Sequence, residues 1–331
     1  MRAFITGGSG FVGKHLIAEL QRKGTPARAL ARSPAAVEAV RAAGAEPFEG
    51  DLSDADRLRQ GMEGCDTVFH SAAYVKTWGP RADFFEANVR GTERVLEAAR
   101  MAGVKRLVHV GTEAVLLDGE PLVRVDETRP IPERPIGNYA STKAEAERLV
   151  LSVNSAELTT VVARPRFIWG PGDTTVLPGF VEAVRTGRFK WIDGGRYLTS
   201  TCHVENCVEG LLLAAEKGRG GQSYFLTDGE PVEFREFITA LLKTQGVEPG
   251  TGSFPGALAA TVALLGDVTW SFLGLSRPPP LSRTEYLLVG REVTVSDAKA
   301  RMELGYEGRM TREAGLRGLT AEVREQAPKA A

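Results

Sequence analysis

Short apolar runs rich in β-branched residues alternate along the first half of the chain with segments of helical periodicity. We interpret these runs as buried strands: RAFITGG, ARALAR, DTVFHSAA, RLVHVGT and TTVVARP. Between DTVFHSAA and RLVHVGT, one helical stripe is formed by Phe85, Val89, Thr92, Leu96 and Ala99. Alternating strands and helices predict an α/β protein with a doubly wound parallel sheet, the Rossmann arrangement.

The pattern changes after Pro165. WGPGD indicates a loop, and LPGFVEAVRTG indicates a helix bounded by the helix-breaking residues Pro and Gly. From Pro231 onward the sequence is helical and interrupted by Pro and Gly, including the triple proline at 278–280. We interpret this tail as part of a smaller, mostly helical lobe that covers the carboxyl edge of the sheet and binds substrate. The expected division is a dinucleotide-binding Rossmann domain over 1–165, rejoined by 190–228, and a substrate lobe over 166–189 and 229–331.

The charge balance of the chain argues against polyanionic partners. The 331 residues include 41 Lys and Arg against 42 Asp and Glu, which gives a formal net charge of -1. A chain without a basic excess has no electrostatic reason to bind nucleic acid, and we expect no such partner. The cysteines, Cys65, Cys202 and Cys207, form no CxxC pair, so neither a disulfide framework nor a zinc site is expected, and a reducing compartment fits.

Two features bear on location. The first predicted strand follows Met1 directly, so we expect no signal peptide and a cytoplasmic protein. The longest apolar stretch, FPGALAATVALLG, falls short of the roughly 20 residues of a membrane-spanning helix. We therefore expect no transmembrane segment. This stretch and the following VTWSFLGL are nevertheless suited to peripheral contact with a membrane or to contact with a hydrophobic substrate.

Glycines follow the first predicted strand at the spacing GxxGxxG: Gly7, Gly10 and Gly13, with a helix expected to begin near Val12. Glycine allows a tight turn, brings backbone amides close to a pyrophosphate, and lets the helix pack against the strand. The N-terminus of that helix faces the phosphates with unpaired N–H groups and its dipole. A structural turn would also use glycine, but the position at the first strand–helix junction predicts dinucleotide binding.

The end of the second predicted strand indicates which dinucleotide binds. A carboxylate at this position accepts the ribose hydroxyls of NAD, whereas this chain has Ala31 followed by Arg32. A guanidinium can hold a 2′-phosphate through paired hydrogen bonds, so Arg32 favours NADP(H) over NAD(H), unless it is only a solvated loop residue. Asp51 follows the third strand, where its carboxylate is placed either to meet the adenine amine or to cap the next helix.

The motif GNYASTKAEAERL places Tyr139 and Lys143 four residues apart on one helix face, and VGTEAV places Thr112 at the end of the preceding strand. A phenol, with an unperturbed pKa of about 10, is a poor acid–base group at neutral pH. A neighbouring ammonium and an oxidised nicotinamide lower that pKa, so we expect Lys143 to tune Tyr139 and to hold the nicotinamide ribose. Thr112 is expected to hydrogen-bond the reacting oxygen. Together with the glycine loop, these residues predict a hydride-transfer site, which needs no metal.

Longer motifs stand in a recognisable order along the chain: TGGSGFVG, GDLSD, HSAA, ANVRGTERVLEAA, YASTK, RPRFIWGPGD, HVENCVEGLLLAAE and YFLTDGEP. In this order the sequence resembles the extended short-chain dehydrogenase/reductase superfamily over nearly its whole length, and within it the 3β-hydroxysteroid dehydrogenase group. RPRFIWGPGD is particularly similar to bacterial 2-alkyl-3-oxoalkanoate reductases. The chain departs from the family at Thr112, where most members have Ser; the hydroxyl is kept, and the extra methyl narrows the pocket.

The resemblance implies roles for individual residues. Thr112, Tyr139 and Lys143 would form the catalytic set, with Asn88 on the helix that orders the site. Backbone groups around Phe167 would meet the nicotinamide carboxamide, and a homodimer would form through the helices that carry Asn88 and Tyr139. Together with the loop and strand-end residues above, the expected cofactor contacts are Gly7, Gly10, Phe11, Val12, Gly13, Arg32, Asp51, Leu52, Ala72, Ala73, Tyr139, Lys143, Pro165, Phe167 and Ile168.

Aromatic residues are the candidates for a hydrophobic substrate pocket. Tyr74 and Trp78 follow the fourth predicted strand, at the carboxyl edge of the sheet, where a substrate wall is expected. Trp169 is the third candidate, although an aromatic residue is equally at home in a core. His70 and His109 lie within strands, and we interpret them as packing residues rather than bases.

Two other functions stay open. Nucleotide-sugar epimerases and dehydratases share the scaffold, but such enzymes usually carry Asn where this chain has Phe167, and 4,6-dehydratases carry Thr-Asp-Glu where it has Thr112-Glu113-Ala114. A non-catalytic NADP(H) sensor would typically lack the Tyr–Lys pair. The sequence favours NADPH-dependent reduction of a hydrophobic ketone or β-keto acid. In this reversible alcohol dehydrogenase reaction Tyr139 donates the proton, and Lys143 and Asn88 help relay its replacement.

Overall fold

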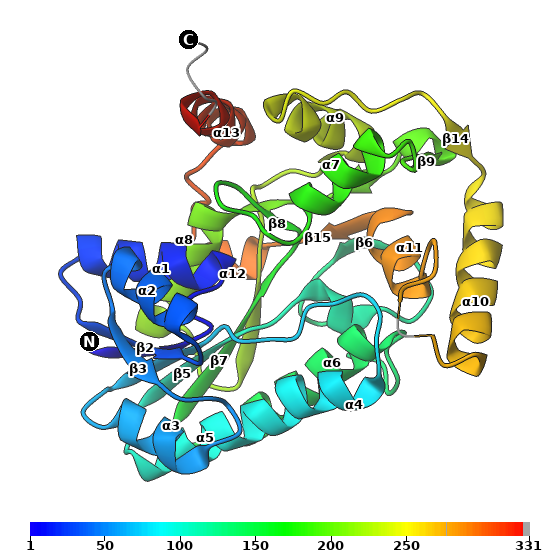
Figure 1. The fold of residues 1–331 in the computed structure, drawn as a ribbon. Coiled ribbons are helices and arrows are strands. Elements are labelled where there is room, and N and C mark those ends of the chain that lie inside the picture. Colours follow the sequence, from blue (N-terminus) through cyan, green and yellow to red (C-terminus); the bar gives the residue numbers. More distant parts are fainter. Residues whose placement is uncertain (276, 327–331) are drawn as a thin grey trace.

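A seven-stranded parallel sheet forms the centre of the larger domain in the computed structural model, which describes residues 1–275 and 277–326 (Figure 1). In spatial order its strands are β12 (Gln222–Leu226), β7 (Thr159–Pro165), β5 (Arg106–Val110), β4 (Thr67–His70), β1 (Ala3–Thr6), β2 (Ala27–Ala31) and β3 (Glu46–Glu49). All neighbours run parallel. The order reverses between β1 and β4, where such sheets form a crevice at the carboxyl ends of their strands. The predicted Rossmann arrangement is confirmed.

Helices cover both faces of this sheet (Figure 1). One face carries α1 (Phe11–Arg22), α2 (Pro34–Ala43), α8 (Val204–Lys217) and α12 (Ala298–Leu304), which enclose an apolar core. The opposite face carries α3 (Ala55–Met62), α5 (Gly91–Met101) and α6 (Asn138–Ser152), which enclose a second core. A strand buried on both faces has no polar side, and for this reason inner strands such as β1 and β4 are mainly apolar runs in the sequence, whereas the edge strand β3 is not.

The stripe from Phe85 to Ala99 is helical, but it is not one regular α-helix. It begins in a π-helical turn (Phe85–Arg90) that follows α4 (Arg81–Phe84) and continues into α5. Single π turns inside α-helices often lie at functional sites. This turn contains Asn88, whose side-chain oxygen accepts a hydrogen bond from Tyr74 N at 2.7 Å.

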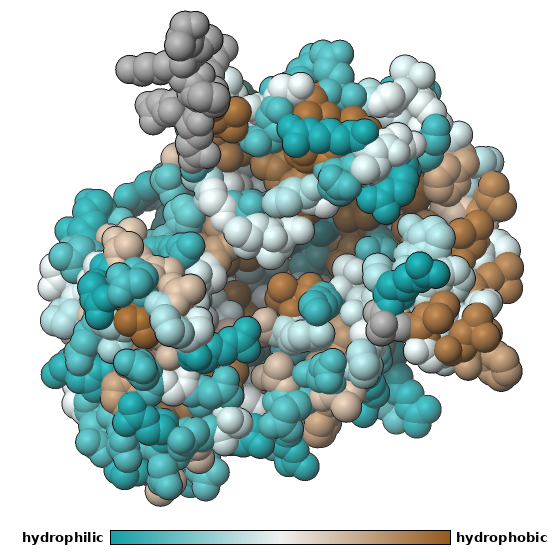
Figure 2. All heavy atoms as spheres, viewed as in Figure 1, coloured by the Kyte–Doolittle hydropathy of each residue, from teal (hydrophilic) through white to brown (hydrophobic). Residues whose placement is uncertain are grey.

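The smaller lobe combines helices with short strands, and Figure 2 shows a hollow between it and the larger domain. Its four-stranded sheet has the order β13 (Val232–Glu233), β10 (Leu198–Thr199), β15 (Val293–Val295) and β6 (Leu122–Val125). Two further pairs join β11 (Cys202–His203) with β8 (Ile168–Trp169) and β14 (Ser253–Phe254) with β9 (Trp191–Ile192). Its helices include α7 (Leu177–Arg185), α9 (Phe234–Thr244), α10 (Gly256–Phe272), α11 (Arg283–Val289) and α13 (Arg312–Gln326).

Strand pairing differs from the expected domain division at two places. β6 comes from the first 165 residues but pairs with β15 of the lobe. β9 and β10 come from the returning segment 190–228 but pair with β14 and β13. The parts of that segment that rejoin the large sheet are α8 and β12. A strand of two residues is too short to show the alternation of apolar and polar residues by which strands are predicted. Its position depends on partners far away in the chain.

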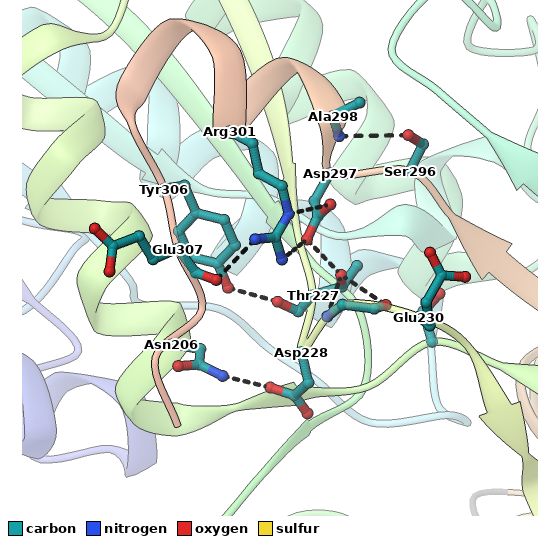
Figure 3. A network of polar contacts seen from close by, with 12 residues as sticks. Asn206, Thr227, Asp228, Glu230, Ser296, Asp297, Ala298, Arg301, Tyr306 and Glu307 are labelled. Carbon is teal, nitrogen blue, oxygen red and sulfur yellow. Dashed lines mark hydrogen bonds and ion pairs between the residues drawn. The ribbon is translucent and has the colours of Figure 1, made fainter. Parts of the chain in front are cut away.

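A polar network joins the end of β12 to the C-terminal segment (Figure 3). Thr227 Oγ1 donates to Asp297 Oδ2 at 2.7 Å, and Arg301 donates to both oxygens of Asp297. Tyr306 donates to Thr227 O at 2.6 Å. The neighbouring Asp228 accepts hydrogen bonds from Trp169 Nε1, Thr201 Oγ1, His203 N and Asn206 Nδ2. The end of β12 is thus bonded through Thr227 to the C-terminal segment and through Asp228 to residues between 169 and 206, which holds these segments together.

Candidate active site

The glycine loop between β1 and α1 makes contacts that leave no room for side chains. Gly7 has a φ of +74°, and a Cβ at this position would lie 2.7 Å from Ala72 N. A Cβ on Gly13 would lie 2.2 Å from Gly7 O, so only glycine lets α1 approach the loop this closely. α1 begins at Phe11 after Gly10, and no side chain caps it. Its first N–H groups are therefore open to an anion.

The end of β2 presents the residue expected to select the dinucleotide. Ala31 is buried, whereas Arg32 is exposed and makes no hydrogen bond or ion pair within residues 1–275 and 277–326. Ser33 accepts a hydrogen bond from Ala36 N at 3.2 Å and caps α2. The chain thus presents a free guanidinium, and no carboxylate, at the end of this strand.

Asp51 and Leu52 follow β3. Asp51 accepts a hydrogen bond from Ser53 N at 2.9 Å, while the residue that caps α3 is Asp54. Of the two roles considered for Asp51, helix capping is therefore excluded, and the contact with adenine stays a prediction. Leu52 packs against the start of α5, since a Cβ on Gly91 would lie 3.2 Å from its Cδ1.

The predicted catalytic side chains come together around α6. Thr112 follows β5 as the N-cap of a short 3₁₀ turn, and Tyr139 and Lys143 lie one turn apart on α6. The Thr112 side chain is close enough to Tyr139 to influence the pKa of the phenol. Asn88 donates to Thr142 Oγ1, also on α6, at 3.2 Å.

A buried ion pair that sequence reasoning missed lies next to these hydroxyl groups. Arg166 Nη1 is 3.1 Å from Glu113 Oε1, and each of the two side chains is 4% exposed. The other oxygen of Glu113 accepts a hydrogen bond from Thr112 Oγ1 at 2.9 Å. Arg166 also donates to Thr199 Oγ1 and Leu288 O, at 3.1 Å and 2.7 Å. The pair therefore holds Thr112 in place and connects it to the smaller lobe.

The pKa of Tyr139 is raised above its usual value. Burial is the largest cause, and the negative charge of Glu113 acts in the same direction, while the nearby Thr112 hydroxyl group lowers the pKa. The sequence had suggested a lowered pKa, because it revealed neither the burial of the phenol nor the carboxylate beside it. A raised pKa keeps the phenol protonated, which is the state that a proton donor needs.

The ammonium of Lys143 is held by β5. Its Nζ donates to Val110 O at 2.8 Å and lies 3.1 Å from His109 Nε2. Burial lowers the pKa of Lys143 to about 8, and the charge of Glu147 opposes this shift. After these two contacts one N–H of the ammonium is left for a ribose hydroxyl. The charge of Lys143 is not among the influences on the pKa of Tyr139, so tuning by Lys143 stays a prediction for the cofactor-bound enzyme.

His70 is fully engaged within the core. Its Nδ1 lies 2.7 Å from Thr6 Oγ1, and its Nε2 lies 2.9 Å from Thr92 Oγ1. Burial, followed by the charge of Lys143, lowers the pKa of His70 to about 3, so the ring is neutral near pH 7. The His109 ring packs against it with centroids 5.1 Å apart. These contacts favour a packing role for both histidines.

The predicted substrate wall is present only in part. Tyr74 and Trp78 are partly exposed in the loop after β4, and Trp78 Nε1 donates to Leu275 O at 3.0 Å, which ties this loop to the smaller lobe. Trp169, in contrast, is fully buried and donates to Asp228 Oδ2 at 2.7 Å. The prediction that Trp169 lines the pocket is therefore wrong. Its indole packs inside the lobe because Asp228 satisfies the N–H there.

The turn between β7 and β8 is strained at the predicted cofactor contact. Phe167 has a φ of +50°, a left-handed conformation that costs a residue with a side chain about 1–3 kcal/mol. Its carbonyl accepts a hydrogen bond from Cys202 N at 3.2 Å, and its ring packs edge-on against Phe237. Such strain is concentrated at binding sites, and the turn directs Ile168 away from Pro165 into β8. The contact with a carboxamide stays a prediction.

Comparison with known proteins places this chain among oxidoreductases. A 4-hydroxy-2-methyl-3-oxo-4-farnesyl-3,4-dihydroquinoline-1-oxide ketoreductase from Stigmatella aurantiaca is 53% identical, covering 96% of this chain and 96% of its own. A 2-alkyl-3-oxoalkanoate reductase from Stenotrophomonas maltophilia is 33% identical, covering 97% of this chain and 99% of its own. The solved structure of MoeE5 with UDP-glucose and NAD is 25% identical with a TM-score of 0.75, covering 99% of this chain and 100% of that one.

These findings confirm the resemblance that the motifs indicated. The similar proteins include ketoreductases, and the shared fold extends to enzymes that bind nucleotide sugars. Residues 4–255 match the 3-beta hydroxysteroid dehydrogenase/isomerase family, which is well over half of the chain. The chain belongs to the 3-beta hydroxysteroid dehydrogenase/isomerase family.

Proposed function

We propose that the protein reduces a hydrophobic ketone or β-keto acid with NADPH, in a reversible alcohol dehydrogenase reaction with Tyr139 as the proton donor. The observation that carries this proposal is the position of three side chains at the carboxyl edge of the sheet. Thr112 follows β5, and Tyr139 and Lys143 lie one turn apart on α6, where Lys143 Nζ donates to Val110 O of β5 at 2.8 Å. The uncapped start of α1 opens at the same edge. The 53% identical relative is itself named a ketoreductase, which supports the assignment.

The glycine loop fits a nicotinamide dinucleotide. The positive φ of Gly7 and the close packing at Gly13 form a backbone cradle, and the open N–H groups of α1 would face the phosphates. The exposed Arg32, next to the uncharged Ala31, supports NADP(H) over NAD(H). When bound, this cofactor supplies the hydride that adds to the carbonyl carbon.

The residues of this chain would position the carbonyl and deliver the proton. Tyr139 donates its hydroxyl proton to the carbonyl oxygen as negative charge develops there. The hydroxyl proton of Thr112, which Glu113 accepts in this structure, would turn to the carbonyl oxygen and fix the direction of that oxygen. Lys143 has one N–H left for a ribose hydroxyl, and it would help to return a proton to Tyr139. Asn88, anchored on α6 through Thr142, would order the path by which that proton arrives.

We propose a substrate in which the carbonyl is joined to a long hydrocarbon group. The two relatives are named for a farnesyl-bearing oxo-dihydroquinoline oxide and for a 2-alkyl-3-oxoalkanoate. Both names combine an oxo group with a hydrocarbon substituent. Tyr74 and Trp78 offer partly exposed aromatic surface for such a group beside the site.

The test is a turnover assay with purified protein, NADPH or NADH, and ketones of increasing hydrocarbon length, followed by loss of the absorbance of the reduced cofactor. We expect turnover with NADPH that becomes more efficient as the chain lengthens. Interconversion of a UDP-sugar without net oxidation of cofactor would indicate an epimerase. Cofactor binding without turnover of any carbonyl would indicate a sensor, and either outcome overturns the proposal.

A further inference from the structure

The outer face of α10 is apolar. Large exposed hydrophobic side chains are concentrated on this helix and just beyond it: Leu258, Val262, Leu264, Leu265, Val268, Phe272 and Leu273. They make up seven of the thirteen large exposed hydrophobic side chains in the described part of the chain. Phe272 alone is 88% exposed. Figure 2 shows hydrophobic atoms gathered along the edge that α10 forms in Figure 1.

The inner face of α10 packs through small residues. Ala259 and Ala263 are buried, and Gly266 lies against Pro279. The one charged residue of the helix, Asp267, is partly buried and accepts a hydrogen bond from Arg283 N at 3.2 Å. Every exposed residue from 256 to 274 is therefore uncharged. A surface helix in contact with water alone normally has a polar outer face. We therefore expect the apolar outer face of α10 to bind another surface.

Basic groups lie beyond the C-terminal end of this apolar face. Arg277 follows the helix and is exposed. Lys76 is also exposed, in a loop that the bond from Trp78 Nε1 to Leu275 O ties to the helix end. An apolar face bordered by cations matches an anionic lipid surface, whose headgroups attract the cations and whose acyl boundary accepts the apolar side chains.

We propose that α10 docks on an anionic membrane surface and that the hydrophobic substrate enters the site from the bilayer, an inference that rests on the proposed function. The helix has 17 residues and is about 25 Å long. None of the helices in residues 1–275 and 277–326 is long and apolar enough to cross a bilayer, so α10 would lie in the plane of the interface. Its C-terminal end meets the loop of Trp78, the proposed substrate wall.

A second copy of the chain is the other occupant to consider. The dimer expected from the family resemblance would use the helices that carry Asn88 and Tyr139, which lie at a different edge of the molecule from α10 (Figure 1). Such a dimer would leave α10 uncovered. The charges of Lys76 and Arg277 favour a lipid surface, because anionic headgroups would pair with both, whereas the α10 face of a second copy has no exposed carboxylate to meet them.

Flotation with vesicles tests the docking. The wild-type protein should float with vesicles of equal parts phosphatidylcholine and phosphatidylglycerol, and less with phosphatidylcholine alone. The double variant Leu265→Asp/Val268→Asp puts two carboxylates on the apolar face, and should bind at least about tenfold more weakly. Met302→Asp is the matched control, because Met302 is a large exposed hydrophobic side chain on α12, away from this face. It should float like the wild type.

Turnover separates the docking from the chemistry. All three proteins should reduce a short, water-soluble ketone equally, whereas a long-chain ketone carried in the anionic vesicles should be reduced about tenfold more slowly by the double variant. Failure of the wild type to float, or equal flotation of the double variant, overturns the docking. A dimer in sedimentation that the double variant splits overturns it too, in favour of a second copy. No reduction of either ketone would instead contradict the proposed function, and flotation would still decide the docking.

Discussion

The Glu113–Arg166 pair and the helix α10 are unusual in opposite ways, because the pair buries two charges and α10 exposes large apolar side chains. Charged side chains are rarely buried, and large apolar side chains rarely gather on one exposed face. The buried pair has its partners within the chain, since Glu113 holds Thr112 and Arg166 reaches Leu288 O. The outer face of α10 has no such partners among the described residues. The pair should therefore affect stability and chemistry in solution, whereas α10 should affect only what the protein binds.

The largest effect is expected beside the buried pair, at the proton donor. Tyr139→Phe should lower turnover of a ketone by about 10²–10⁴-fold, the usual contribution of a general acid, because water must then supply the proton. Affinity for NADPH, measured by fluorescence titration, should stay near the wild-type value. Reduction at close to the wild-type rate would show that Tyr139 is not the donor.

Breaking the buried pair should cost stability without any ligand being present. Arg166→Met leaves the Glu113 carboxylate buried without its counter-charge and should lower the free energy of unfolding by about 3–5 kcal/mol, measured by urea denaturation. Arg22→Met is the matched control, because Arg22 pairs with Glu19 on the surface. Its unfolding midpoint should stay close to that of the wild type. Equal midpoints for the two variants would show that the buried pair does not stabilise the fold.

Sequence reasoning predicted what is encoded at short range. The inner strands of the large sheet are mainly apolar runs, Gly7 and Gly13 stand at fixed places in a short loop, and the four-residue spacing of Tyr139 and Lys143 sets one helix face. These features need no knowledge of distant parts of the chain. The fold class and the location of the candidate site could therefore be derived before any coordinates were known.

Long-range contacts could not be derived in this way. Glu113 and Arg166 follow different strands, and neither GTEA nor RPRF indicates that the two charges meet in the core. Trp169 was misplaced for the same reason, because the partner that keeps it buried, Asp228, follows a strand far along the chain. The π turn at Asn88 also escaped prediction, since it leaves the helical stripe intact.

Arg32 differs from Arg166 in that its guanidinium is exposed and has no partner among the described residues. Its proposed partner is a 2′-phosphate from outside the chain, so Arg32→Ala should leave the unfolding midpoint unchanged. The loss of charged hydrogen bonds worth about 1.5–3 kcal/mol should weaken NADPH binding roughly 10–100-fold. Binding of NADH should hardly change, and fluorescence titration of both cofactors provides the measurement. An equal effect on NADPH and NADH would show that Arg32 does not contact the phosphate.

The smallest expected effect is a shift in pH dependence, and it tests whether the buried pair acts on the chemistry as well as on the fold. Glu113→Gln removes the charge that helps to raise the pKa of Tyr139, yet it keeps an acceptor for Thr112. The pKa of Tyr139 should therefore fall. Oxidation of the alcohol uses the phenolate as base, so its rate rises with pH up to that pKa.

The rising limb of the pH profile for oxidation should therefore move to lower pH in Glu113→Gln. Lys143 and Arg166 carry the other charges close to this part of the site, and both stay in place in this variant. Glu145→Gln is the control, because Glu145 lies on the same helix as Tyr139 but its side chain is 42% exposed and pairs with Arg81. A limb that stays where it is in both variants would mean that the charge of Glu113 does not reach the phenol. A rising limb that moves only in Glu113→Gln would show that the Glu113 carboxylate influences the pKa of Tyr139 directly. An ion pair with a purely structural role would have no such influence.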